Sequence, residues 1–149
     1  MKIQEGEGEI EGGGSNNQTK RNRILLVDDE PDLCTLYQIV LEDAGYKCTS
    51  YTDSVKALQE FKPNYYDLIL LDIKMPVLDG FELCKKVREA DKSIGIIFIT
   101  ASGQFYKKIR EQRHPEVINS NSIKYIQKPI ANEELIKILD TMMSARDTN

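Results

Sequence analysis

Short apolar runs alternate with amphipathic segments along most of this chain, and that alternation is the feature that most restricts its fold. Continuous apolar stretches, such as residues 68–71 and 94–99, are typical of strands buried on both faces of a sheet. The candidate strands are residues 24–27, 46–51, 68–71, 94–99 and 123–127. A segment with helical periodicity follows each of them. Five strands alternating with five helices predict a doubly wound α/β domain with a parallel sheet.

Local residues mark the borders of the candidate helices. Pro31 suits a first helical turn, and Gly45 suits a helix end. Asp53 and Asn132 are predicted as caps of two later helices, and residues 104–114 form the most weakly periodic candidate. The first helix is predicted to pack on the sheet through an apolar stripe that comprises Leu33, Leu36, Tyr37, Val40, Leu41 and Ala44.

Composition sets the class of protein. The chain has 149 residues, of which 40% are hydrophobic, so it can form one domain with a substantial core. A net charge of −4 argues against a protein that coats nucleic acid. No stretch is long and apolar enough for a membrane span, and the N-terminus lacks a secretory signal. Three cysteines without paired spacing indicate reduced residues in a cytoplasmic protein.

The N-terminal segment differs from the rest of the chain. Residues 1–21 hold five of the nine glycines, and most of the others are polar. Such a segment is predicted to be disordered because it buries too little apolar surface to offset its ordering entropy. The domain is therefore predicted to span residues 22–146.

Polar side chains stand where the predicted strands end. Asp28 and Asp29 follow the first strand, and Asp72 follows the third. Thr100 follows the fourth strand, and Lys128 follows the fifth. The carboxyl ends of parallel strands form one functional edge. Clustered carboxylates suit Mg²⁺, and a lysine suits an anion. The sequence thus predicts a site for an acidic nucleophile, a hard metal ion and a phosphoryl group.

These motifs resemble those of the response regulator receiver domain of two-component signalling, over residues 22–145. Residues 27–31 match its acidic pair, and residues 70–76, with Asp79-Gly80 following, match its phosphoacceptor strand and loop. Residues 99–101 match its switch hydroxyl, and Tyr125 with Lys128-Pro129 matches its switch aromatic and lysine. The resemblance implies a flavodoxin-like (βα)5 fold with strand order 2-1-3-4-5.

The resemblance also implies a chemistry for this edge. Asp72 would accept a phosphoryl group from a phosphohistidine. Mg²⁺, or Mn²⁺ in its place, would be bound by Asp29, Asp72 and the Lys74 main-chain carbonyl, and Asp28 would act through a metal-bound water. Lys128 would pair with Asp72 and then with the phosphoryl oxygens.

Other positions would transmit the signal or set its duration. Thr100 would move towards the phosphoryl group, and Tyr125 would turn inward to fill the space. The peptide bond before Pro129 would be cis. Lys74 and Ser102 would flank the path of the attacking water and modulate the lifetime of the acyl phosphate.

The implied partners are proteins. A sensor histidine kinase or a phosphotransfer protein would supply the phosphoryl group, and an unknown protein would receive the signal, with no direct binding of nucleic acid or membrane. The chain would not be an enzyme beyond its own dephosphorylation. Since it ends about twenty residues after Lys128, a stand-alone receiver is expected, either a phosphorelay intermediate or a diffusible signal.

Three other functions compete with this interpretation of the residues. The first is a phosphorylation-independent adaptor that keeps the fold, which the full set of site residues disfavours. A phosphohydrolase with an aspartate nucleophile needs Asp-x-Asp, whereas Asp28 is followed by Asp29-Glu30. A dinucleotide-binding module needs a glycine-rich turn after the first strand, and none is present. The single histidine, His114, lies in a polar stretch and is predicted to be a solvated surface residue.

One segment departs from the family pattern. Between Thr100 and Lys128 the chain is longer than expected, and the predicted helix is broken at Pro115. This segment is basic in an acidic protein, with Lys107, Lys108, Arg110 and Arg113. The choice of downstream partner, and any dimerisation through this segment, therefore stay open.

Overall fold

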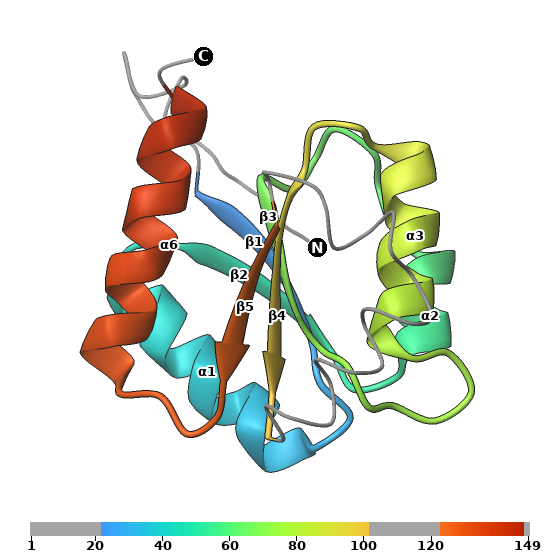
Figure 1. Cartoon of the computed structure of the whole chain (residues 1–149), viewed down its shortest axis with the longest axis horizontal. Coiled ribbons are helices and arrows are strands. Elements are labelled where there is room, and N and C mark those ends of the chain that lie inside the picture. Colours follow the sequence, from blue (N-terminus) through green and yellow to red (C-terminus); the bar gives the residue numbers. More distant parts are fainter. Residues whose placement is uncertain (1–21, 102–122, 148–149) are drawn as a thin grey trace, which may run out of the picture.

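A parallel five-stranded sheet forms the centre of the protein (Figure 1). The computed structural model describes residues 22–101 and 123–147. Its strands are β1 (Arg23–Val27), β2 (Lys47–Tyr51), β3 (Leu68–Asp72), β4 (Gly95–Thr100) and β5 (Ile123–Gln127). They pair in the order β2-β1-β3-β4-β5, and every pairing is parallel. The predicted fold class and strand order are confirmed.

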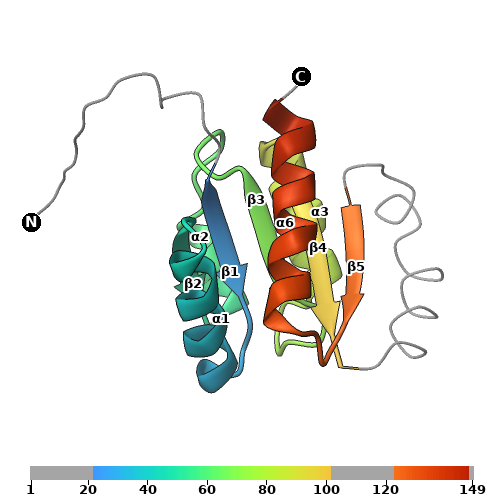
Figure 2. The ribbon, with the colours of Figure 1, turned by 90° about the vertical axis from the view of Figure 1, so that its left-hand side faces the viewer.

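Helices cover both faces of this sheet (Figure 2). The described helices are α1 (Pro31–Asp43), α2 (Ser54–Gln59), α3 (Gly80–Ala90) and α6 (Asn132–Asp147). Helices α2 and α3 pack on one face, and α1 and α6 pack on the other. The predicted helix at residues 104–114, the predicted tail at residues 1–21 and Ser102 all lie outside the described residues.

The central strands are apolar throughout because both of their faces are covered. All of β3 and β4 is buried, and successive residues point to opposite layers. Ile69 and Phe98 face α2 and α3, whereas Leu70 and Ile99 face α1 and α6. Burial of one such side chain stabilises the fold by about 1.5–3 kcal/mol. The edge strand β2 is more polar, with a burial pattern of exposed and half-buried residues.

Two details of the helices differ from the sequence prediction. Leu36 and Ala44 were expected in the buried stripe of α1, but 47% of Leu36 is exposed, Ala44 is exposed at the end of the helix, and Cys34 is buried instead. Asn132 was expected to cap the last helix, but it is the first residue within α6, whose opening turn is closed by the Leu135 N–H donating to the Ala131 carbonyl. Asp53 does cap α2, and its carboxylate accepts the N–H groups of Val55 and Lys56.

The three cysteines are free thiols, as predicted. Cys34 and Cys84 are buried, and Cys48 is half-buried. Burial raises the pKa of Cys34 to about 11 and the pKa values of Cys48 and Cys84 to about 12. The thiolate forms are therefore scarce at neutral pH. No helix in the described part of the chain has the length and apolar character needed to cross a membrane.

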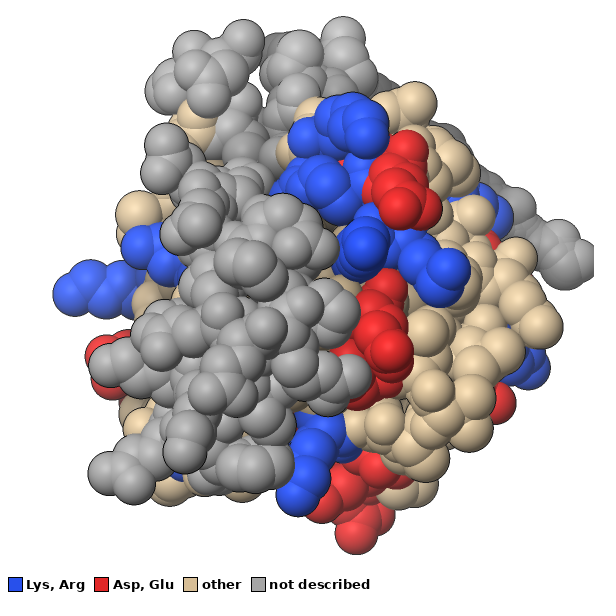
Figure 3. Space-filling model, turned by 45° about the vertical axis from the view of Figure 1, so that its right-hand side comes forward, with Lys and Arg blue, Asp and Glu red and all other residues tan. Residues whose placement is uncertain are grey.

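The amino edge of the sheet is held by side chains of its own. The Asp67 carboxylate accepts the N–H groups of Asn22 and Arg23, each at 3.0 Å, which fastens the start of β1 beside β3. The Arg23 guanidinium lies 4.4 Å from the centre of the Tyr65 ring, and the Lys62 ammonium lies 4.9 Å from it. On the face shown in Figure 3, basic side chains are most numerous in the upper half, with acidic side chains both among them and below them.

Asp91 fastens two loops at the same edge. Its carboxylate accepts the Asn64 N–H at 2.8 Å and the Ser93 N–H and hydroxyl at 3.0 and 3.1 Å. Burial alone would raise the pKa of Asp91, but these donors outweigh burial and lower it below its ordinary value of 3.8.

We predict that Asp91→Asn lowers the free energy of unfolding by about 1–2 kcal/mol at pH 7, because the amide accepts these hydrogen bonds less strongly. A lowered carboxyl pKa contributes stability above pH 3.8, and that contribution is lost as the pH falls through the folded-state value. The difference in free energy of unfolding between Asp91→Asn and the wild type, measured by urea titration, should therefore shrink as the pH falls below the folded-state pKa of Asp91. An equal gap at every pH would contradict this account.

Candidate functional site

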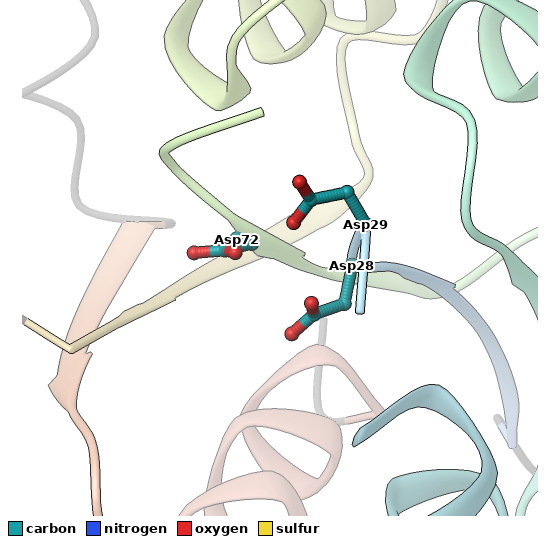
Figure 4. Close-up of side chains that lie close together, drawn as sticks. All are labelled: Asp28, Asp29 and Asp72. Atoms are coloured by element: carbon teal, nitrogen blue, oxygen red, sulfur yellow. The ribbon is translucent and has the colours of Figure 1, made fainter. Parts of the chain in front are cut away.

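Three carboxylates lie together at the carboxyl edge of the sheet. Asp28 and Asp29 follow β1, and Asp72 is the last residue of the neighbouring strand β3. One oxygen from each of the three lies within 4.8 Å of the others, and Figure 4 shows the three side chains as neighbours at the ends of their strands. Asp28 is fully buried, and only 8% of Asp72 is exposed. The predicted convergence of these residues is what the structure shows.

Local main-chain groups fix two of these carboxylates. The Glu30 N–H donates to Asp28 Oδ1 at 3.0 Å, and the Ile73 N–H donates to Asp72 Oδ1 at 2.8 Å. The Oδ2 atoms of both residues lie towards Lys128. Oxygen ligands at this spacing suit a hard divalent cation such as Mg²⁺, which binds well through a small number of carboxylates.

Lys128 brings a positive charge to the cluster from the end of β5. Its ammonium lies 3.1 Å from Asp28 Oδ2 and 3.9 Å from Asp72 Oδ2. The sequence predicted a pairing with Asp72, and the structure adds a closer one with Asp28. The Lys128 N–H donates to the Thr100 carbonyl at 2.6 Å, which sets the lysine beside the end of β4. The Lys128–Pro129 peptide bond is cis, as expected.

Charge and burial act against each other at Asp72. Burial, followed by the Asp28 and Asp29 carboxylates, raises its pKa, while Lys128 and the Ile73 N–H lower it, and the net result is a pKa of about 6. Burial lowers the pKa of Lys128, but Asp72 and Asp28 outweigh burial and raise it. The Lys128 ammonium therefore compensates the clustered negative charge only in part, and a cation bound here would compensate it further.

Gly80 brings α3 into close contact with the end of β3. A Cβ at this position would lie 2.2 Å from the Asp72 carbonyl oxygen, so only glycine fits. Its N–H donates to the Ile73 carbonyl at 2.7 Å. Gly80 belongs to the motif that the sequence predicts after β3, and the close approach of two main chains is the physical reason for a glycine there.

The predicted switch residues lie on β4 and β5. Thr100 is buried at the end of β4, and Tyr125 is half-buried on β5. The Tyr125 ring stacks on Phe98, with ring centres 5.3 Å apart and planes at 14°. Phe98 in turn packs on Phe81 at 5.1 Å. Sequence reasoning missed Phe98, although its position two residues before Thr100 puts it on the same face of the strand.

Of the two residues expected to modulate the acyl-phosphate lifetime, one is described. Lys74 is exposed in the connection between β3 and α3, two residues beyond Asp72. Ser102 is not among the described residues.

The chain belongs to the response regulator receiver domain family. The family's sequence model matches residues 24–140. The transcriptional regulatory protein DltR of Streptococcus agalactiae is 35% identical over 76% of this chain and 48% of its own length. The alkaline phosphatase synthesis transcriptional regulatory protein PhoP of Bacillus subtilis is 38% identical over 58% of this chain and 36% of its own length. The chain thus spans half or less of the length of these curated relatives.

Solved structures show the same fold. The non-phosphorylated receiver domain of HemR from Leptospira biflexa superposes with a TM-score of 0.68 at 26% identity, covering 83% of this chain and 95% of that one. The chemotaxis protein CheY4 of Vibrio cholerae gives a TM-score of 0.67 at 28% identity, covering 82% of this chain and 98% of that one. This chain is therefore a receiver domain of the two-component type in sequence and in fold.

We predict that Asp72→Asn raises the free energy of unfolding by about 1–3 kcal/mol at pH 7 without divalent cations, because it removes a buried, repelled charge. A carboxyl pKa raised from 3.8 to about 6 destabilises the fold fully above pH 6 and not at all below pH 3.8. The gain in stability of Asp72→Asn over the wild type should therefore disappear below pH 3.8. Asp32→Asn, at an exposed position of α1, should change stability little at either pH, and a loss of stability in Asp72→Asn would contradict this account.

We predict that Gly80→Ala destabilises the domain by about 2–4 kcal/mol, because the new methyl group would clash with the Asp72 carbonyl. Thermal unfolding measures the effect. Gly95→Ala is the matched control, since its nearest neighbour, the Met142 methyl carbon, would lie at 3.4 Å. Equal destabilisation by the two substitutions would show that the close approach at Gly80 is not special.

Proposed function

We propose that this chain is a phosphoacceptor that takes a phosphoryl group from the phosphohistidine of a sensor kinase, or of a phosphotransfer protein, onto Asp72 in the presence of Mg²⁺. The observation that carries the proposal is the cluster of three carboxylates within 4.8 Å, with Lys128 in contact with two of them. Membership of the receiver family and the fold support the same conclusion.

In the proposed reaction, a carboxylate oxygen of Asp72 attacks phosphorus. The new O–P bond forms as the P–N bond to the histidine breaks, and the imidazole leaves with the electron pair and takes up a proton. Asp28, Asp29, Asp72 and the Lys74 carbonyl would hold Mg²⁺, whose charge would neutralise phosphoryl oxygens. Lys128 would turn from its carboxylate partners to the phosphoryl group, because that group brings about 1.5–2 negative charges to the site.

The same proposal gives the remaining residues their roles. Thr100 would donate its hydroxyl to the phosphoryl group, and Tyr125 would report the change on the face of β5. Lys74 and Ser102 would influence how quickly water removes the phosphoryl group. The product is a switched protein surface and not a released compound, so we propose no enzymatic turnover beyond self-dephosphorylation and no direct contact with nucleic acid. A cytoplasmic location is part of the proposal.

The decisive test is intact mass after incubation with acetyl phosphate. We predict one phosphoryl adduct on the wild type in Mg²⁺, and none in EDTA or on Asp72→Asn. Lys128→Met should lower the yield at least severalfold, because the positive charge that faces Asp72 is removed. Asp53→Asn, at the exposed cap of α2, is the matched control and should label normally.

Three results would reject the phosphoacceptor. The absence of an adduct in Mg²⁺ would favour an adaptor that acts without phosphorylation. An adduct that persists on Asp72→Asn would move the chemistry to another residue. Sustained turnover of phosphate esters would indicate a hydrolase instead.

A further inference from the structure

The connection between β3 and α3 contains a strained residue close to the proposed phosphoacceptor. Val77 has a φ of +69°, and the Leu78 N–H donates to the Pro76 carbonyl at 2.7 Å. A hydrogen bond from residue i+2 to residue i around a left-handed centre defines a γ-turn of the rare, strained kind. A β-branched side chain makes that conformation more costly, because its Cβ substituents crowd the main chain.

The rest of the connection holds the turn in place. The hydroxyl of Ser54, buried at the start of α2, donates to the Leu78 carbonyl at 2.7 Å. On the other side, the Gly80 N–H donates to the Ile73 carbonyl, and the Met75 side chain is buried. A strained conformation persists when its surroundings fix it in this way, and such residues concentrate at functional sites.

Packing within the domain does not offset the strain at Val77. Val77 is 90% exposed, which is a larger fraction than for any other exposed large hydrophobic residue in the described part of the chain. Glycine or asparagine would adopt this backbone at lower energy. The valine thus strains the turn and buries almost no apolar surface within the domain, which leaves its side chain available for contact with another molecule.

The position of the turn indicates which molecule that is. The turn belongs to the connection that begins at Asp72 and returns to it through Gly80, at the lower edge of the sheet in Figure 1. Asp72 is only 8% exposed, so a protein that presents a phosphohistidine to it must rest on the surrounding rim. Pro76 and Val77 are exposed on one part of that rim, and Pro129 is exposed beside Lys128. A phosphodonor as small as acetyl phosphate needs no such support from the rim.

We propose that the Val77 side chain is a specificity-determining contact for the protein phosphodonor, against which it packs an apolar group of the phosphohistidine-bearing protein. This inference rests on the proposed function of Asp72. It assigns Val77 to recognition of the donor and not to the transfer reaction itself. Small and protein phosphodonors should therefore respond differently to substitutions at this residue.

The experiment compares the full-length wild type with Val77→Ala, Val77→Gly and Asn64→Gly. Val77→Ala keeps the left-handed backbone and removes two methyl groups, whereas Val77→Gly also relieves the strain. Asn64 is the matched control, since it has a φ of +63° and is exposed, but it lies in the α2–β3 connection at the opposite edge. Each protein is labelled with acetyl phosphate and, separately, with a panel of autophosphorylated sensor-kinase catalytic cores, of which the fastest donor to the wild type is kept.

Both Val77 variants should accept phosphoryl groups about tenfold more slowly from the kinase core, because one apolar contact is lost, and at an unchanged rate from acetyl phosphate. Val77→Gly should also raise the melting temperature by a few degrees, while Asn64→Gly should keep wild-type transfer rates.

Several outcomes would overturn the inference. Wild-type transfer from the kinase core to Val77→Gly would show that the donor does not use this side chain. Equal slowing with acetyl phosphate would mean that the turn shapes the Asp72 site itself. Labelling of the wild type by acetyl phosphate but by no kinase core would also count against a protein contact here. If acetyl phosphate also failed to label the wild type, the proposed function of Asp72 would be rejected as well.

Discussion

The proximity of Asp28, Asp29 and Asp72 is the constraint on which the rest of the site depends. Parallel pairing of β1 with β3 brings the three carboxylates to one edge, where burial and mutual repulsion oppose their ionisation. Lys128 relieves part of this repulsion and is positioned from a strand that is two places away from β3. The site therefore exists only when the whole sheet from β1 to β5 is assembled, so its electrostatics depend on long-range topology.

The sequence was sufficient for the fold because its signals were strong and mutually consistent. Runs such as residues 68–71 and 94–99 are typical of strands buried on both faces, which requires helices on each side of the sheet. The resemblance to receiver domains supplied the strand order. The carboxyl ends of parallel strands lie at one edge of a sheet. The residues that follow those ends could therefore be assigned to one edge without any knowledge of distances: Asp28, Asp29, Asp72, Thr100 and Lys128.

Other features depend on details that residue patterns do not encode. Leu36 lies at a helical spacing shared with buried neighbours, but the width of the face that α1 turns to the sheet decides its exposure. The closer pairing of Lys128 with Asp28 depends on the reach of a long side chain. The left-handed backbone of Val77 could not be predicted, because valine is among the residues least suited to it. Phe98 was hidden among equally apolar neighbours, and only its ring contacts set it apart.

The Asp67 carboxylate also determines where the described chain enters the domain. By accepting the N–H groups of Asn22 and Arg23, it fastens the chain at the amino edge, opposite the edge that holds Asp72. The chain ahead of Asn22 therefore joins the domain at the edge opposite the carboxylate cluster. An affinity tag, a fluorescent label or a surface linker could be attached there. The protein can be immobilised through that end, so that the edge with Asp28, Asp29 and Asp72 faces the solution, as a binding assay requires.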